Sequence, residues 1–299
     1  MMKRLILALV AMAIMVPSWG WSYARQKDMH KLLELPNFTT NNGAQNRYYN
    51  FRNQKGNDDK RTSMTQPFFS ISYNPGLHIP YWVAWKLTKE HVSSQYKVQS
   101  DRKVIADPTV PGCPTGNDYS GVGRMTPPYS RGHMCPNADN RWCQEAVNDC
   151  YFMTNMVPQS MMMNAGRWEL LESLCRSWAK QFGAVYIACG PVPEKNMEVL
   201  PFNKKMRIGM PKQCFKVVMR HDSKEGYKAI GWIFNQDNTC RSMTIDEVEK
   251  MTGLDFFHNV PEKEERAMES KMEIKDWPRA YQIEEKKHLV NYILASFFK

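Results

Sequence analysis

The stretch Tyr129-Ser130-Arg131-Gly132-His133 stands near the middle of this 299-residue chain and carries its clearest chemical signal. His133 has the side chain whose ordinary pKa, about 6.5, suits a base near neutral pH. Arg131 offers a fixed fork of N–H donors for phosphate oxygens, and Gly132 lets the backbone approach a ligand closely. Because a lone histidine is more often structural, the stretch has to be weighed with the residues that follow it.

Four polar residues follow at spacings that a helix would bring together. Asn164 lies nine residues after Asn155, Glu172 eight residues after Asn164, and Arg176 four residues after Glu172. The apolar spacing of residues 163–182 predicts a helix, which places Asn164 at its start and Glu172 about two turns along. A carboxamide oxygen suits Mg²⁺, and a carboxylate can hold one of the waters that Mg²⁺ keeps. Taken singly, each residue also has a structural interpretation. Asn164 would be a helix N-cap, and Glu172 would form an i,i+4 surface pair with Arg176.

Taken together, these segments resemble the DNA/RNA non-specific endonuclease family, the ββα-metal or His-Me finger nucleases. The resemblance rests on ordered motifs, which are Tyr129 to Asp139, Thr154-Asn155-x-x-Pro158-Gln159, Asn164-x-Gly166-x-Trp168-x-x-Leu171-Glu172, and Arg176. Further landmarks are Pro80-x-Trp82-Val-Ala-x-x-Leu87, Gly190-Pro191, Pro211 with Phe215-Lys216, and Thr252 to Phe257. The similarity covers roughly residues 64–278.

The resemblance implies a metal-dependent mechanism. His133 would be the general base that activates the attacking water. Asn164 would be the sole direct protein ligand of one Mg²⁺, with Mn²⁺ or another divalent cation as a substitute. Glu172 would orient the hydrated metal. Because the base must be neutral, we expect activity to fall as the pH drops through the acid range.

The resemblance also implies how the substrate is held. Arg131 and Arg176 would hold the scissile phosphate and its developing charge, and Asn155 would help to shape the site. These groups face phosphate, which carries no sequence information, so DNA and RNA would both be cut with weak base preference. One departure from the family pattern stands out: Ser130 replaces the usual Asp before Arg-Gly-His, which puts rate and metal affinity in doubt.

The hydrophobic pattern predicts an α+β fold. Alternating or buried apolar runs predict strands at 68–73, 81–87, 149–154, 185–189, 214–220 and 228–234. A Gly/Pro-rich loop is expected at about 107–132, and Thr244-Ile-Asp-Glu247 is a capping box that opens a short helix. The resemblance specifies this class further, as a ββα-metal (His-Me finger) fold with a central, mainly antiparallel sheet and a long helix carrying the metal site.

The two ends of the chain differ in composition from its middle. Residues 1–24 combine a basic start, a short apolar run and small residues suited to cleavage, which is typical of a secretory signal peptide. We therefore expect an exported protein, periplasmic or extracellular, with no stable membrane insertion after cleavage. Residues 25–62 are interpreted as a polar linker, 63–278 as the endonuclease domain and 279–299 as a helical tail.

Charge and cysteine content agree with this interpretation. The chain has 40 Lys and Arg against 30 Asp and Glu, a net charge of +10, which favours anionic partners such as nucleic acid. An even number of cysteines, eight, in an exported chain indicates disulfide bonds, one of them near the site at Cys135.

Two other functions fit part of the pattern. One is a non-catalytic, disulfide-stabilised basic module that binds nucleic acid or polysaccharide, in which His133 and Asn164 are structural. The other is a hydrolase that pairs His133 with a cysteine nucleophile, although no cysteine stands in a recognisable nucleophile motif.

Overall fold

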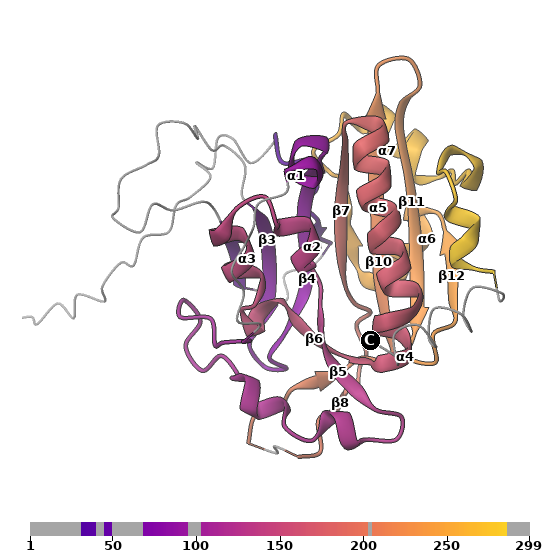
Figure 1. Ribbon diagram of the computed structural model, residues 1–299. Helices are drawn as coiled ribbons and strands as arrows, with labels where there is room; N and C mark the ends of the chain where they lie inside the picture. The colour runs from indigo at the N-terminus through magenta and orange to yellow at the C-terminus, as the bar shows by residue number, and fades with distance from the viewer. Residues whose placement is uncertain (1–30, 40–44, 50–67, 95–102, 203–204, 286–299) are drawn as a thin grey trace, which may run out of the picture.

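A seven-stranded antiparallel sheet forms the centre of the protein (Figure 1). The computed structural model describes residues 31–39, 45–49, 68–94, 103–202 and 205–285. The order of the strands across the sheet is β12-β11-β10-β7-β4-β3-β2. Their bounds are β2 Gln45–Tyr49, β3 Phe69–Asn74, β4 Ile79–Thr88, β7 Ala184–Pro191, β10 Gln213–Asp222, β11 Gly226–Asn235 and β12 Cys240–Met243.

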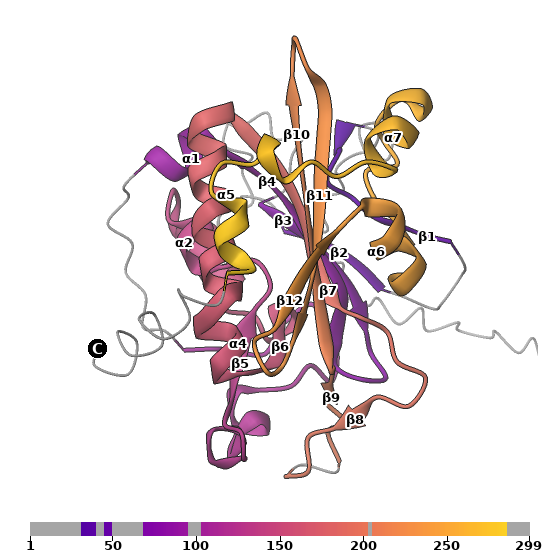
Figure 2. The ribbon, with the colours of Figure 1, turned by 90° about the vertical axis from the view of Figure 1, so that its right-hand side faces the viewer.

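Helices cover both faces of the sheet, so its middle strands are apolar on both sides. The long helix α5 packs on one face, and α6 and α7 pack on the other (Figure 2). In β10, Val218 belongs to the core under α5, while Phe215 and Val217 belong to the core under α6 and α7. The helices are α1 Lys89–Ser93, α2 Asn137–Asn140, α3 Gln144–Cys150, α4 Met161–Met163, α5 Glu169–Phe182, α6 Ile245–Thr252 and α7 Glu262–Glu269. None of the helices in the described ranges is long and apolar enough to cross a membrane.

A separate hairpin leads into α5 and makes a ββα unit. Strand β5 (Tyr129–His133) pairs antiparallel with β6 (Met156–Ser160), with His133 opposite Met156. From β6 the chain runs through α4 and a π-helical turn, Asn164–Trp168, into α5. The remaining short elements are β1 Asn37–Phe38, β8 Glu198–Val199, β9 Gly209–Met210, β13 Leu254–Asp255, and 3₁₀ turns at Gly116–Tyr119, Val122–Arg124, Met153–Asn155, Ile274–Asp276 and Ala280–Ile283.

Two predictions of local structure are wrong. Residues 149–154 do not form a strand, because they complete α3 and the following 3₁₀ turn. A short apolar run fits a buried helix as well as a strand, and here the packing of Val147 and Cys150 decides for the helix. The loop expected at about 107–132 ends early, since Tyr129–His133 is strand β5, whose partner β6 lies more than twenty residues away.

The predicted linker also contains parts of the fold. Strand β2 pairs along its length with β3 and forms one edge of the central sheet, and β1 pairs with β13. Leu32 and Leu35 are buried in the core under α6 and α7. The apolar run that contains them, Leu32-Leu33-Glu34-Leu35, is short and was not recognised as part of the core.

The two termini are only partly described. The predicted signal peptide, residues 1–24, lies outside the described residues. Of the predicted helical tail, the described part is the 3₁₀ turn Ala280–Ile283, in which Ala280 and Ile283 are buried. The strands predicted around 68–73, 81–87, 185–189, 214–220 and 228–234 are confirmed, as is the capping box of α6.

The expected disulfides are not formed in this structure. All eight cysteines are free thiols, six of them buried. They are distributed over helices, strands and loops of the core, where they pack as small apolar side chains. Burial raises the pKa of every one of them, for example that of Cys175 to about 12. The prediction that Cys135 is in a disulfide near the site is therefore wrong for this structure.

Candidate active site

His133 ends strand β5 and is half-buried. Its Nε2 atom is buried and has no hydrogen-bond partner, and its ring meets the edge of Tyr151 with 5.1 Å between ring centroids. Burial, together with the nearby positive charge of Arg131, lowers the pKa of His133 to about 4. The imidazole is therefore neutral at physiological pH, with a ring nitrogen available to accept a proton.

Gly132 is needed for packing within the hairpin. A Cβ atom at this position would overlap the side chain of Gln159, which is buried against the strand. Sequence reasoning assigned Gly132 to close approach of a ligand, whereas the structure shows close approach of β6. The absence of a side chain lets the two strands fit together directly before His133.

Asn155 fixes the backbone that follows His133. Its Oδ1 accepts a hydrogen bond from the Cys135 backbone N–H at 2.9 Å, and its Nδ2 donates to the carbonyls of Cys135 and Cys150. The Asn155 carbonyl accepts from Met134 N–H at 2.9 Å. Asn155 is fully buried, so it shapes the site by holding the loop after His133 and does not reach a substrate.

Asn164 begins the π-helical turn that joins the hairpin to α5. Its Nδ2 donates a hydrogen bond to Ser130 Oγ at 3.0 Å, and Ser130 Oγ donates to the Gln159 carbonyl at 3.2 Å. This orientation leaves Asn164 Oδ1 without a partner within the described part of the chain. Backbone distortions of this kind are frequent at functional sites, and Gly166 provides the non-helical backbone here.

Ser130 thus orients Asn164, one of the two residues on which the predicted chemistry depends. It lies three residues before His133 on the same strand, a span of about 10 Å, and it contacts Asn164 directly. His133 and Asn164 therefore lie on one ββα unit.

Glu172 lies on α5 about two turns beyond Asn164, with its side chain only 12% exposed. Its Oε1 is 3.7 Å from Nζ of Lys216, which is completely buried on β10. Burial raises the pKa of Glu172 to about 7, although Lys216 counteracts the shift. Lys216 Nζ lies 3.9 Å from the centroid of the Trp168 ring, a cation–π contact that compensates part of its desolvation.

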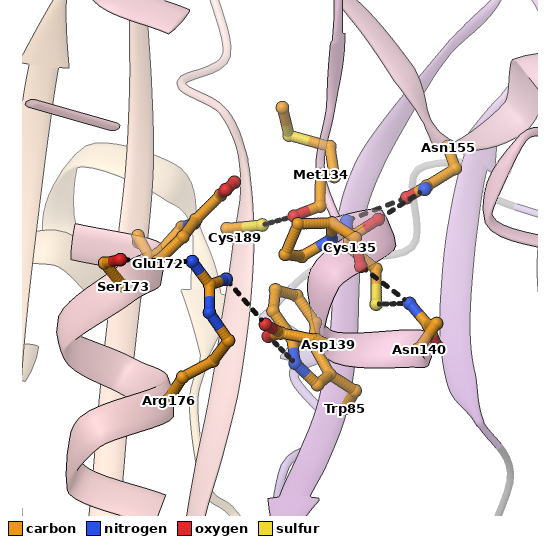
Figure 3. A network of polar contacts seen from close by, with 12 residues as sticks. Trp85, Met134, Cys135, Asp139, Asn140, Asn155, Glu172, Ser173, Arg176 and Cys189 are labelled. Atoms are coloured by element: carbon orange, nitrogen blue, oxygen red, sulfur yellow. Dashed lines mark hydrogen bonds and ion pairs between the residues drawn. The ribbon is translucent and has the colours of Figure 1, made fainter. Parts of the chain in front are cut away.

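Arg176 does not project freely toward a ligand in this structure. Its guanidinium donates to Asp139 Oδ1 at 2.9 Å and to Ser173 Oγ at 3.2 Å (Figure 3). Asp139 is buried, and its other oxygen accepts from Trp85 Nε1 at 3.0 Å. The prediction that Arg176 holds phosphate is not tested by this contact, which ties α5 to the segment after His133.

Arg131 is exposed and shares a side of β5 with His133, because the two are separated by one residue of a strand. It donates a hydrogen bond to the Gly116 carbonyl at 3.3 Å. A single long contact leaves most of its donors available, which suits an anion-binding group.

The donor set fits a hard divalent cation. Asn164 offers a neutral oxygen whose orientation is fixed by Ser130, and Glu172 offers a carboxylate on the same helical segment. Mg²⁺ binds through one or two protein oxygens and retains several waters, so few protein ligands suffice.

Three contributors escaped sequence reasoning. Lys216, Asp139 and Tyr151 contact the predicted residues, but they come from separate parts of the chain. Lys216 stood in a recognised landmark, and its position in the middle of an apolar strand was the available signal. The cysteine-nucleophile alternative loses support, since burial keeps the thiols protonated and none is hydrogen-bonded to His133 among the described residues.

Comparisons with known proteins agree with this geometry. The chain is 30% identical over 227 residues to a nuclease of Nostoc sp., covering 70% of this chain and 78% of that protein. It is 30% identical over 214 residues to nuclease C1 of Cunninghamella echinulata, covering 66% and 83%. Mitochondrial nuclease EXOG of Xenopus laevis matches at 30% identity over 213 residues, and there this chain spans only 56% of the relative.

The fold matches that of a solved nuclease, and a family model covers most of the chain. The crystal structure of the EndoG/EndoGI complex aligns with a TM-score of 0.54 at 22% identity, over 66% of this chain and 85% of that one. The model of the DNA/RNA non-specific endonucleases matches residues 42–263, which begin next to strand β2 and include the whole ββα unit. The chain is therefore a member of the DNA/RNA non-specific endonuclease family, with its ββα-metal fold.

Proposed function

We propose that this protein hydrolyses internal phosphodiester bonds of DNA and RNA, with His133 as general base and one Mg²⁺ at Asn164. The observation that carries the proposal is the neutral ring of His133, whose buried Nε2 has no partner, on the hairpin that also fixes Asn164. A base in this state accepts a proton without first losing one.

Each residue of the site has a separate role in the proposed hydrolysis. His133 takes a proton from the water that attacks phosphorus, which a general base accelerates about 10²–10⁴-fold. The exposed guanidinium of Arg131 binds phosphate oxygens and stabilises the charge that develops on them. Asn164 Oδ1 would hold the cation directly, and Glu172 would orient it through water. When bound, Mg²⁺ supplies charge stabilisation to the phosphate and to the leaving oxygen.

Arg176 acts as a positioning residue in this proposal. Its bond to Asp139 joins α5 to the segment that follows His133, so it keeps Glu172 and His133 in a fixed relation. This role differs from the phosphate contact predicted by the family resemblance, and it follows from the contacts of Arg176 in the structure.

Substrate breadth and location are also proposed. The proposed contacts involve phosphate, and a net charge of +10 adds affinity that does not depend on base sequence. We infer export from the signal-peptide pattern at residues 1–24. Some relatives are mitochondrial nucleases, so location is variable within the family.

A plasmid-nicking assay tests the proposal directly. The wild-type protein should convert supercoiled to relaxed and linear DNA with Mg²⁺ and not with EDTA. His133→Ala should reduce turnover at least about a hundredfold, because it removes the base. His221→Ala, which changes an exposed histidine of β10, serves as the matched control and should retain activity.

The outcomes separate the proposal from its alternative. Binding of nucleic acid without cleavage by the wild type under all metal conditions would identify a non-catalytic binding module. Near-normal cleavage by a folded His133→Ala protein would rule out His133 as the base.

A further inference from the structure

Five carboxylates meet on the face of the sheet opposite α5. Figure 2 shows α6 and α7 on this face. Ligand oxygens of Asp246, Glu249 and Glu269 all lie within 4.8 Å of one another. The same holds for Asp255, Glu265 and Glu269, so Glu269 belongs to both groups. We call these five residues the α6–α7 acidic cluster.

Glu269 is the buried centre of the cluster. Its side chain belongs to a residue only 7% exposed, and its Oε1 is buried without a hydrogen-bond partner. Glu265 Oε1 is likewise buried and unpartnered. Buried polar atoms are almost always paired in folded proteins, so two unpartnered carboxylate oxygens on residues that lie beside other carboxylates point to a site that can bind a cation.

Among the described residues, no basic side chain is paired with the cluster. Arg266 pairs with exposed Glu262 on the outer side of α7. Within the ranges that the structure describes, none of the five carboxylates forms an ion pair with Lys or Arg. Within the cluster, Glu249 Oε1 accepts a hydrogen bond from the backbone N–H of Phe256 at 2.7 Å. Burial, followed by the neighbouring carboxylates, raises the pKa of Glu269 to about 8.

Apolar packing holds the carboxylates together despite their repulsion. The capping box of Thr244 and Glu247 starts α6 and so places Asp246 and Glu249 one turn apart on one side. Gly253, with a positive φ of 68°, turns the chain into β13. Beneath the cluster, the core residues that hold these elements are Val248, Leu254, Phe256 and Met268.

We propose that the α6–α7 acidic cluster binds one Ca²⁺. Calcium takes six to eight oxygen ligands at about 2.3–2.6 Å, so ligand oxygens on opposite sides of the ion are about 5 Å apart. In each group the three ligand oxygens lie close enough together to contact one ion of this size, and Glu269 is common to both groups. Mg²⁺ keeps several waters and prefers fewer carboxylates, which makes it the poorer fit. The site is on the other side of the sheet from α4 and α5, the helices between which Asn164 lies, so it would stabilise the packing of α7 and take no part in hydrolysis.

Calcium titration of metal-free protein tests the proposal. To exclude the active site, the experiment uses the Asn164→Ala protein beside the wild type. Calorimetry should give one Ca²⁺ per chain, and Ca²⁺ at a hundred times Kd should raise Tm by about 5–10 °C. Glu269→Gln should lower the affinity for Ca²⁺ at least about tenfold, because it removes a buried charged ligand. Glu264→Gln, an exposed change on the same helix, should leave both readouts unchanged.

Several outcomes would contradict the proposed calcium site. One is an equal Tm with Ca²⁺ and with EDTA in the wild type. Another is stabilisation by mild acid alone with no response to Ca²⁺, which would mean that protons neutralise the cluster. Metal-free Glu269→Gln should fold at least as well as the wild type, since repulsion is relieved. If it does not fold, Asp255→Asn is the second variant, and an unchanged calcium response there would contradict the proposal.

Discussion

Ser130 occupies the position where family members usually carry Asp, and its hydroxyl bonds both Asn164 and the Gln159 carbonyl. The hydroxyl therefore takes over one function that a carboxylate could serve, which is to accept the hydrogen bond from the Asn164 amide. What Ser130 lacks is the negative charge beside the proposed metal.

Substitutions at Ser130 should change the response to metal more than the chemical step. Ser130→Ala removes a neutral hydrogen bond worth about 0.5–1.5 kcal/mol, so the Mg²⁺ concentration for half-maximal activity should rise about 2–10-fold. Ser130→Asp restores an acceptor and adds charge, so that concentration should fall below the wild-type value. Metal titrations of nicking rate check both, and a Ser130→Ala titration identical to the wild type would show that the hydrogen bond is unimportant.

The titration of His133 should occur far below its ordinary range. Burial and Arg131 lower the pKa to about 4, so the base stays neutral down to about pH 5, and the acid loss of activity expected from the sequence moves to lower pH. The unfolded chain takes up this proton near pH 6.5, so His133 also destabilises the fold as pH falls from 6.5 to 4.

NMR titration of ¹³C-labelled histidines measures this pKa directly, with His133→Ala to assign the signal. A value near 6.5 would mean that the ring is solvated and not buried as described.

At the scale of single residues, the sequence indicated candidates for the chemistry more readily than the residues that support them. His133 and Asn164 were recognised because their types and spacing are tied to chemistry. Asp139 was recognised only as part of a motif, because its contact with Arg176 joins residues 37 apart. The contact depends on how α2 packs against α5, which no local pattern encodes.

Helix α5 and strand β10 contact each other through the buried charges of Glu172 and Lys216, whose desolvation costs free energy of folding. Lys216 is fully buried, and the pKa of its ammonium group is raised, because the nearby negative charges led by Glu172 outweigh burial, which on its own would lower it. The pair fixes the position of Glu172 and keeps part of its negative charge, both of which the proposed metal site uses.

Lys216→Met should damage both stability and activity. Loss of one partner of a buried pair costs about 3–5 kcal/mol, and the pKa of Glu172, already about 7, should rise further. Activity at neutral pH should therefore fall and recover partly as the pH is raised. Adding Glu172→Gln should restore much of the Tm, because no unpaired buried charge remains.

The matched control is Lys228→Met, which breaks a partly exposed pair with Asp276 and should cost about 1 kcal/mol or less. Thermal denaturation and pH–rate profiles of the four proteins test the idea. Equal losses for Lys216→Met and Lys228→Met would contradict it.

Element boundaries show where pattern analysis fails. Five of the seven strands of the central sheet were predicted, because mainly apolar runs such as Cys214–Arg220 fit a buried strand. Strand β5 was missed because its residues are polar and partly exposed, and only the pairing with β6 makes it a strand. Strand β2 was missed because its sequence, Gln45-Asn-Arg-Tyr-Tyr49, is mostly polar, and only the pairing with β3 makes it a strand.

At the scale of the whole molecule, the central sheet separates the two proposed sites. The ββα unit and its proposed metal site lie with α5 on one side, and the α6–α7 acidic cluster lies on the other. Gathering five acidic groups away from the site leaves the excess positive charge of the chain to the remaining surface. An anionic substrate should therefore bind with strong dependence on salt.

Binding of nucleic acid should weaken steeply as monovalent salt rises at fixed Mg²⁺. Each duplex phosphate neutralised contributes a slope of about −0.9 to log K against log salt, so two contacts already give about a tenfold loss between 50 and 200 mM. Arg131 is the exposed cation nearest the base in sequence, and Arg131→Gln should make this slope shallower by about 0.9. His133→Ala should leave the slope unchanged, since a neutral ring releases no counterion. Kd is measured by fluorescence anisotropy in Ca²⁺-free buffer, and all proteins carry His133→Ala so that the nucleic acid is not cleaved. If Arg131→Gln leaves the slope unchanged, Arg131 does not contact phosphate.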